Sequence, residues 1–376
     1  MIKKIAGIIA VLCMALAIIY ICRVGQPLVF ERDTSLSFDL PTDTRDILYY
    51  ASLAPSGHNT QPWKISYNKQ TNTFTLSFDS RRGLPQVDPH NRESFISLGA
   101  FLENWKQAAQ AHGYGASISI LPEPDSGAGV ARIVLAPAEV RQEGKLPSGG
   151  EQILAGMRGR HTDKRRYESR PIPEAALKTI LEKNRPYLHF YAKGTSEYVW
   201  LSRNAVEAMR TQALHEGKRA ELADWLRFSD AEARLAKDGL PAEQLGLTGP
   251  IKALFYIFYD RESAAKKSFA MEAIKQTEQQ VDSAAGFFVV TGSQDFAGTI
   301  RAGMHFERFW LDAVSLGISI HPMSQILEEA PFAGNVMKEL NLNEPVQMIV
   351  RAGMNKDYGQ NNRVRRGIGS FVFLEK

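Results

Sequence analysis

Residues 54–63 read Ala-Pro-Ser-Gly-His-Asn-Thr-Gln-Pro-Trp and are the first of three segments whose residue types could bind a ligand. The two prolines fix backbone dihedral angles, while the serine, asparagine and glutamine offer hydrogen-bond donors and acceptors on a stiff loop. This combination suits the recognition of a planar ring with heteroatoms at its edge. The alternative is an ordinary loop between a helix and a strand that contains two prolines.

Two cationic clusters are the second and third segments. Residues 158–167 place several arginines, a lysine and a threonine close together. A phosphate dianion favours such charge-assisted donors together with a neutral hydroxyl. The alternatives are a solvated basic loop or a patch that touches anionic lipid. Residues 363–366 form a further basic cluster near the carboxyl end, and its significance depends on its joining the first cluster on one phosphate.

Motifs for self-sufficient side-chain catalysis are missing from the sequence. It contains no phosphate loop, no G-x-G-x-x-G after a strand, no H-E-x-x-H and no G-x-S-x-G. The eight histidines show no i, i+4 pairing, so we expect no metal site. Both cysteines, Cys13 and Cys22, precede the main body, which excludes a cysteine nucleophile, a disulfide or a zinc cluster there. A cofactor would therefore have to carry any chemistry.

The composition indicates a folded chain with one large domain or two smaller ones. The 376 residues are 44% hydrophobic and 23% charged, which excludes a disordered chain. Lysine and arginine number 45 against 41 aspartates and glutamates, and the net charge of +4 is too small for a dedicated nucleic-acid binder. We expect no nucleic-acid partner.

The amino-terminal 24 residues have the pattern of a membrane anchor or a signal. Residues 5–22 carry no charge, and a spanning helix needs about 20 apolar residues. A cleaved signal is the alternative, but the only small-x-small pattern, at residues 15–17, lies inside the apolar run. Lys3 and Lys4 slightly outweigh Arg23, which favours a single-pass protein of the inner membrane whose body faces outward.

The remaining sequence predicts an α+β fold in two halves. Residues 25–40 read as a linker, residues 41–150 as the first half and residues 151–376 as the second. Helical patterns alternate with strand pairs of the hairpin type, which indicates α+β rather than a doubly wound parallel sheet. The second half carries a helix-rich insertion at about residues 196–284.

A self-comparison suggests that the two halves are related. Each half has a helix that ends at a glycine before a short β-type stretch. The matching positions, all 204 residues apart, are Gly99, Glu103, Trp105, Ala109 and Gly113 against Gly303, Glu307, Phe309, Ala313 and Gly317. We expect two pseudo-repeated halves that pack face to face as an internal dimer.

Taken together, these segments resemble the FMN-dependent nitroreductase family, and most of all its Acg-like branch, in which one chain contains two nitroreductase-like halves. Residues 55–63 are similar to the family's flavin loop, and residues 160–164 resemble its phosphate motif. Residues 303–317 with residues 320–324 resemble the segment that faces the flavin N5 edge, and Arg365-Arg366 resembles the closing basic pair. The likeness runs from about residue 41 to the end.

The resemblance implies one FMN per chain, bound between the two halves of a monomer. Arg160, Lys164 and Arg365 or Arg366 would neutralise the phosphate, Lys164 would face N1 and O2, and a backbone N–H near Met323 or Ser324 would face N5. No catalytic side chain is assigned, because the flavin carries the chemistry. The implied FMN-binding residues are Pro55, Ser56, Asn59, Gln61, Arg160, Thr162, Lys164, Met323, Ser324, Arg365 and Arg366.

The resemblance also implies a ping-pong oxidoreductase. A reductant, NADH or NADPH, would charge the flavin, and a small organic acceptor would discharge it. As a hypothesis, the helical insertion forms a lid over the flavin. If that lid excludes nicotinamide, the alternative is a protein that binds or sequesters flavin without turnover. A surface that meets lipid and binds no flavin is a third reading.

Overall fold

The computed structural model describes residues 14, 28, 31–123, 129–137, 145–359, 361 and 364–375. Its helices and strands confirm the α+β prediction. The first half consists of α2 (Thr42–Ala51), β1 (Trp63–Asn68), β2 (Thr73–Phe78), α3 (Arg92–Ala111), β3 (Tyr114–Ile120) and β4 (Gly129–Pro137), with short 3₁₀ turns at Gly57–Asn59 and Ser80–Arg82.

The second half repeats this element order around an insertion. Its framework is α4 (Gly150–Gly159), α5 (Glu174–Lys183), β5 (Leu188–Ala192), β6 (Gly286–Thr291), α12 (Phe296–Ser315), β7 (Ile318–Pro322), the short helices α13 (Gln325–Glu328), α14 (Ala330–Ala333) and α15 (Val336–Glu339), and β8 (Val346–Met354). The insertion between β5 and β6 holds α6 (Ser196–Leu214), α7 (Glu216–Trp225), α8 (Asp230–Ala236), a 3₁₀ turn (Ala242–Leu245), α9 (Gly249–Phe258), α10 (Arg261–Ala264) and α11 (Lys267–Asp282).

The two sheets have the same strand order, as the predicted pseudo-repeat requires. The first sheet runs β3-β4-β2-β1, and the second, read from the matching edge, runs β7-β8-β6-β5. All neighbouring pairs in both sets are antiparallel. The first sheet gains one more strand, β9 (Val372–Leu374), which pairs in parallel with β1. The carboxyl end of the second half therefore returns to the first half.

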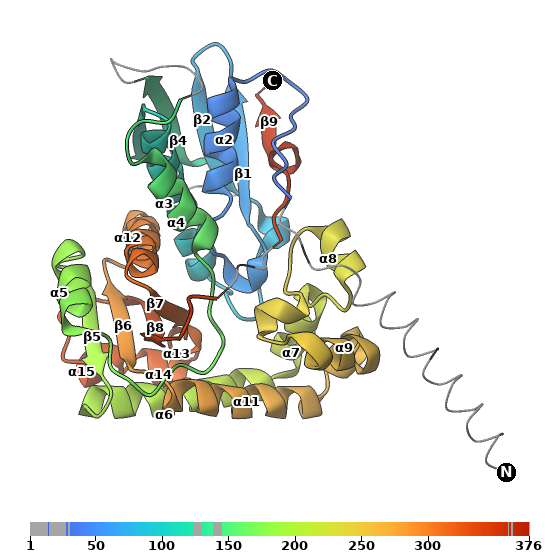
Figure 1. The fold of residues 1–376 in the computed structure, drawn as a ribbon, viewed down its shortest axis with the longest axis vertical. Coiled ribbons are helices and arrows are strands. Elements are labelled where there is room, and N and C mark those ends of the chain that lie inside the picture. The colour runs from blue at the N-terminus through green and yellow to red at the C-terminus, as the bar shows by residue number, and fades with distance from the viewer. Residues whose placement is uncertain are drawn as a thin grey trace.

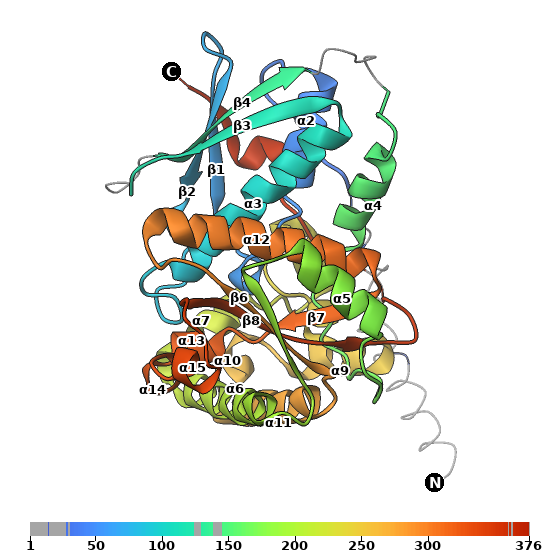
Figure 2. The same cartoon turned by 90° about the vertical axis from the view of Figure 1, so that its left-hand side faces the viewer.

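Helices α3 and α12 cross between the two sheets and join the halves (Figure 2). A Cβ atom on Gly99 would lie 2.0 Å from the carbonyl oxygen of Ile300, and one on Gly303 would lie 2.2 Å from that of Ile96. Both glycines and both isoleucines are 204 residues apart, so each contact has its counterpart, as in a two-fold interface. Ile300 packs in the core of the first half and Ile96 in that of the second. The offset-204 repeat is confirmed as a pseudo-two-fold axis.

The second sheet is buried on both faces, because the insertion covers its outer side. Phe288 and Val290 of β6 face the core that contains α12, while Phe287 and Val289 pack with α6. Figure 1 shows α6 and α11 lying along this outer side, with α7, α8 and α9 beyond its edge. None of the helices in the part of the chain that the structure describes is long and apolar enough to cross a membrane. The anchor predicted over residues 1–24 lies outside the described residues, apart from Met14.

Candidate functional site

A cavity of about 290 Å³ lies at the seam between the two halves. Its walls come from residues 55–59, the start of α3, the middle of α12, the segment before α5, the end of β7 with α13, and the insertion. Parts of both halves are thus needed to enclose it. Eight of the eleven predicted site residues line it, namely Pro55, Ser56, Asn59, Arg160, Thr162, Lys164, Ser324 and Arg365.

The loop of residues 54–63 holds an unusual backbone conformation. His58, Asn59 and Gln61 have positive φ angles of 46°, 55° and 54°. Residues other than glycine rarely adopt this left-handed region of the backbone, and each one costs on the order of 1 kcal/mol. The Ser56 hydroxyl accepts a hydrogen bond from the Gln61 N–H at 3.0 Å and closes the loop on itself. Such strain persists only where the surroundings fix the backbone, as they often do at binding sites.

Arg365 fixes this loop to the end of α2. Its guanidinium donates to the carbonyls of Ser52 and Ala54, at 2.8 and 2.9 Å, and to the side-chain oxygen of Asn59. The Asn59 amide nitrogen in turn donates to the carbonyl of Gly239 in the insertion at 2.9 Å. Burial together with a neighbouring arginine lowers the pKa of Arg365 to about 9. Asn59 and Arg365 therefore line the cavity mainly as its scaffold.

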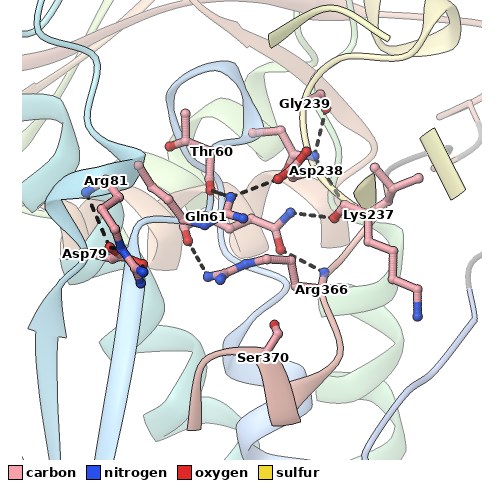
Figure 3. A network of polar contacts seen from close by, with 12 residues as sticks. Thr60, Gln61, Asp79, Arg81, Lys237, Asp238, Gly239, Arg366 and Ser370 are labelled. Carbon is pink, nitrogen blue, oxygen red and sulfur yellow. Dashed lines mark hydrogen bonds and ion pairs between the residues drawn. The ribbon is translucent and has the colours of Figure 1, made fainter. Parts of the chain in front are cut away.

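Gln61 and Arg366 lie outside the cavity lining and tie the loop to the insertion (Figure 3). The Gln61 amide nitrogen donates to the carbonyl of Lys237 at 2.9 Å, and its oxygen accepts from the Arg366 N–H at 3.0 Å. Arg82 donates to Asp238 of the same insertion segment at 2.9 Å. The geometry thus gives Gln61 and Arg366 a structural task, and their predicted contact with FMN stays a prediction.

Arg160 forms a buried ion pair with a carboxylate of the crossing helix α12. Its Nε lies 2.9 Å from Oε1 of Glu307 on α12, and its guanidinium lies 4.4 Å from the ring centre of Trp310. It also donates to the carbonyl of Leu53 at 2.7 Å. Arg160 therefore has a carboxylate partner from the crossing helix, which the sequence motif did not indicate.

Two further arginines of the 158–166 run are paired with carboxylates. Arg158 contacts Glu151, and Arg165 contacts Asp163 at 2.8 Å. Lys164 differs, because its ammonium group has no hydrogen-bond or ion-pair partner among the described residues and faces the cavity. A single lysine of this run is thus poised for a ligand.

Burial and the nearby Arg351 lower the pKa of Lys164 to about 8. At pH 7 such a lysine is charged although burial has removed much of its solvation. An anion in the cavity would compensate for that lost solvation. Thr162, two residues earlier, also lines the cavity and supplies a neutral hydroxyl. The phosphate role of Thr162 and Lys164 stays a prediction.

The segment after β7 differs from its prediction at one atom. The main-chain N–H of Met323 donates to the carbonyl of Ile349 at 2.8 Å, within the sheet. It is therefore not available to the N5 edge of a flavin, and the prediction is wrong for this N–H. Ser324 lines the cavity and remains the candidate of the two.

His321 lines the cavity and Arg351 contacts it from behind, and both were missed from the sequence as site residues. The buried Arg351 donates from Nε to Nδ1 of His321 at 3.0 Å and to the carbonyls of Asp163 and Arg165 at 2.9 Å each. Burial and the adjacent cations keep the pKa of His321 well below its usual value, so its ring is neutral. The sequence did offer a signal for Arg351, because an arginine is unusual in a largely apolar strand such as β8.

His58 faces the same space from the loop. Its Nε2 is buried and has no hydrogen-bond partner among the described residues. Burial and Lys164 lower the pKa of His58 to about 4, so it is neutral at pH 7 and can donate or accept one hydrogen bond there. A buried polar atom without a partner is costly, which marks this point of the wall as a contact for a ligand.

A second cavity of about 280 Å³ adjoins the first inside the insertion. Helices α6, α7 and α11 build it, and it shares His58, Lys164 and His321 with the first cavity. The side chains that line it deeper in the insertion are mostly apolar, among them Leu222, Leu226, Leu245, Leu247 and Phe269. No group of three or more histidine, cysteine, aspartate or glutamate side chains within the described ranges is placed to hold a metal ion.

Comparisons with known proteins cover most of the chain. It is 25% identical over 301 residues to PigM of Serratia sp., a probable NAD(P)H nitroreductase, which spans 74% of this chain and 79% of that protein. It is 22% identical over 335 residues to acg of Mycobacterium tuberculosis, which bears the name of an NAD(P)H nitroreductase, with 86% of this chain and 91% of that protein covered. No protein-family model matches the chain.

Solved structures give a weaker likeness. The FMN-dependent nitroreductase NfnB from Mycobacterium smegmatis, solved with NADPH, has a TM-score of 0.33 and 15% identity, and the match covers 54% of this chain and 86% of that one. An FMN-bound nitroreductase from Bacteroides fragilis has a TM-score of 0.30 and 16% identity, with 54% and 87% covered.

Proposed function

We propose that this chain is an FMN-dependent oxidoreductase of the nitroreductase type, with one flavin in the cavity at the seam. The observation that carries the proposal is a group of three cations on the cavity wall. Arg160, Arg365 and Lys164 line it, and Arg160 pairs with the carboxylate of Glu307 on α12. The cavity wall also holds Glu93, Glu243 and Glu328, but none of them forms an ion pair with Lys164 or Arg365 among the described residues. The charges of Lys164 and Arg365 therefore suit a phosphate dianion. The similarity to two proteins named as nitroreductases supports the choice of FMN.

The residues present fit such a cofactor. Lys164 and the buried Nε2 of His58 are polar groups that await a partner. Thr162 and Ser324 add donors, and apolar side chains such as Phe306 supply the surface that a ring system needs. These groups would hold the phosphate at one end and the ring at the other, while Asn59 and Arg365 keep the loop in place.

Bound FMN would take a hydride from NADH or NADPH and pass two electrons to an organic acceptor. The chain's own part is electrostatic. Lys164 is a cation in a poorly solvated site, where a positive charge stabilises developing negative charge more strongly than it would in water. His58 and His321 carry no charge, because burial keeps both rings neutral, so the positive charge on this part of the wall is that of Lys164.

The apolar cavity inside the insertion is the proposed acceptor chamber. It shares His58, Lys164 and His321 with the first cavity, so a molecule lodged there would lie beside the flavin site. Its lining favours a small, largely uncharged organic molecule. The insertion would act as the lid predicted from the sequence.

A flavin-holding protein without turnover is the second candidate. The observation that favours it is the tie between the lid and the loop, in which Asn59 and Gln61 bond to the backbone of Gly239 and Lys237. A lid held in this way would retain flavin and restrict the entry of nicotinamide. Attachment to the membrane through residues 1–24, with the body facing outward, remains part of the proposal from the sequence alone.

Anaerobic reduction of the reconstituted protein tests the proposal. We expect the flavin absorption to bleach within seconds on adding NADH or NADPH, and to return when a quinone or nitroaromatic acceptor is added. Flavin that dithionite bleaches but neither nicotinamide does would favour the holding protein. A chain that takes up no flavin would contradict both.

A further inference from the structure

Two carboxyl groups from opposite halves of the chain meet on the wall of the seam cavity. Glu93 is in the first turn of α3, and Glu328 is the last residue of α13. Both line the cavity, and their carboxyl groups lie within hydrogen-bonding reach of each other. Oε2 of Glu93 also lies about 4.0 Å from the point where a Cβ on Gly57 would stand, which places it beside the flavin loop.

The partners of Glu328 are all neutral or acidic. The Gln212 amide of α6 donates to its Oε2, and the Ser324 hydroxyl also contacts it. No lysine or arginine pairs with Glu328 among the described residues. The nearest ion pair on its own segment joins Glu329 to Lys218 and leaves Glu328 out.

Glu93 is only weakly compensated. Its Oε1 lies 3.3 Å from the guanidinium of Arg92, which is itself bonded to the carbonyl of Gln347. The side chain of Asp88 accepts the N–H of Glu93 in the first turn of α3, and burial together with Glu93 raises the pKa of Asp88 to about 6. Glu93 therefore neighbours two other carboxyl groups, and Arg92 is the one arginine or lysine paired with it among the described residues.

Two ionised carboxylates in contact in a poorly solvated place repel each other strongly, and the usual resolution is that they share a proton. Burial and Glu93 together raise the pKa of Glu328 well above its ordinary value. The other titratable groups on the cavity lie on different segments from Glu93 and Glu328, namely His58, Arg160, His161, Lys164, Glu243, His321 and Arg365. The third carboxylate among the lining residues, Glu243, is paired with Lys252.

We propose that Glu93 and Glu328 together hold one proton on the cavity wall at neutral pH and that Glu328 delivers it to the acceptor. This role rests on the proposed function. Two-electron reduction of an acceptor A requires a hydride and a proton, which together give AH₂. Bound FMN, when reduced, would supply the hydride. The O–H bond of Glu328 breaks as the new O–H or N–H bond of the product forms, and the carboxylate left beside Glu93 recovers its proton from solvent.

The first test needs no flavin. Infrared spectra of the full chain at pH 7 should show the stretch of a neutral buried carboxyl group, which the variants Glu328→Gln and Glu93→Gln lose. Glu339→Gln, on an exposed carboxylate of α15, should keep it. A wild-type spectrum without a neutral carboxyl would overturn the shared proton whether or not the chain binds FMN.

The second test separates delivery from structure. In the reoxidation of the reduced, loaded protein by a quinone, Glu328→Gln should slow the reaction by about 10² to 10⁴ fold, the usual contribution of a positioned acid. The wild-type rate should fall as the pH rises through the pKa of the pair, and the variant should lose this dependence. Glu328→Asp should restore part of the rate.

FMN affinity serves as the structural control, because neither carboxyl is assigned to the phosphate. A variant that binds FMN as the wild type does and is reoxidised at the wild-type rate would overturn delivery. The failure of the proposed function has a different signature, namely no flavin uptake by the wild type while the infrared result stands.

Discussion

The two halves of the chain share a framework and differ in what was added to it. Both run helix, strand, strand, helix, strand, strand, and both place their strands in the same spatial order. Residues 69–72 join β1 to β2 in the first half, whereas the whole helical insertion, α6 to α11, stands between β5 and β6 in the second. The outer face of the first sheet keeps partly exposed positions such as Lys64, while every residue of β6 is buried.

The difference shows how a two-fold framework comes to have one site. In the second half, the loop before β5 and the start of α12 correspond to the flavin loop and the start of α3, and they line a cavity of about 580 Å³ that holds no residue of the first half. Among the described residues, Arg301 is the sole lysine or arginine that lines it, and Glu344 lines it as well. The rings of Tyr187 and His305 stack there at 3.8 Å. This cavity lacks the group of cations that a dianion requires, so we expect it to bind no FMN.

Equivalent glutamates on the crossing helices show the same divergence. Glu307 of α12 pairs with Arg160, which is buried beside it. Its counterpart Glu103 of α3 is also buried, but it accepts a hydrogen bond from the neutral Gln107 at 2.7 Å. Among the described residues, Glu307 is thus the one of the two glutamates that is paired with a cation.

The largest expected effect comes from removing that cation. Arg160→Met should lower the free energy of unfolding of the flavin-free protein by about 3 to 5 kcal/mol, because Glu307 is left charged and buried. Gln107→Met on the other side should cost only about 1 to 2 kcal/mol. Urea unfolding followed by circular dichroism measures both, and Arg160→Met with Glu307→Gln should recover most of the loss. Equal costs for the two single variants would remove the distinction between the sides.

Substitution of the crossing glycines should show the shared part of the framework. Gly99→Ala and Gly303→Ala each force the helices apart and should cost about 3 kcal/mol, at the upper end of the range for overpacking. Because the two sites share one crossing, the double variant should cost less than both together. Gly156→Ala in α4, where a Cβ meets nothing within 4 Å, should gain up to about 1 kcal/mol. Unequal costs for Gly99 and Gly303 would weaken the pseudo-two-fold interpretation.

Lys164 should account for much of the affinity for FMN. Lys164→Met should raise the Kd about 10 to 100 fold, the value of one charge-assisted contact. The nearby exposed Arg166 offers a control, since Arg166→Met should stay within about two-fold. In the flavin-free protein the pKa of Lys164 is about 8. The affinity of the wild type for FMN should therefore change little from pH 7 to about 8 and fall at higher pH, as the ammonium group loses its proton. Fluorescence titration of FMN at several pH values measures this, and an unchanged Kd for Lys164→Met would refute the assignment.

The smallest effect concerns the loop that only the first half carries. Ser56→Ala removes the hydrogen bond to the Gln61 N–H and should speed FMN dissociation about five-fold, which corresponds to about 1 kcal/mol. Stopped-flow release into excess apoprotein of a tighter flavin binder reports this rate. Ser370→Ala, which removes a similar bond to the carbonyl of Gly367 at 2.8 Å, should leave it unchanged. Equal rates for Ser56→Ala and wild type would argue against a role for loop stiffness.

The framework was predictable from the sequence, because its signals are local or repeat. The glycines, the apolar faces and the 204-residue offset suffice to place α3 against α12. The eight residues that reach the cavity were found by resemblance, since their motifs are short and contiguous.

The rest depends on the path of the insertion and could not be predicted. Gln61 bonds Lys237 across 176 residues, and Asn59 bonds Gly239 across 180, through backbone carbonyls that carry no sequence signature. Glu93 and Glu328 come from opposite halves, and neither lies in a motif. The N–H of Met323 or Ser324 was predicted to face the flavin, and the motif does not reveal that β8 already accepts the Met323 N–H.

The central claim is that two related halves build one flavin site and not two. The full chain, loaded with excess FMN and then desalted, should retain close to one equivalent of flavin by visible absorption against protein concentration. Two equivalents would mean that the chain has a second working site, and none would contradict the assignment of the seam cavity to FMN.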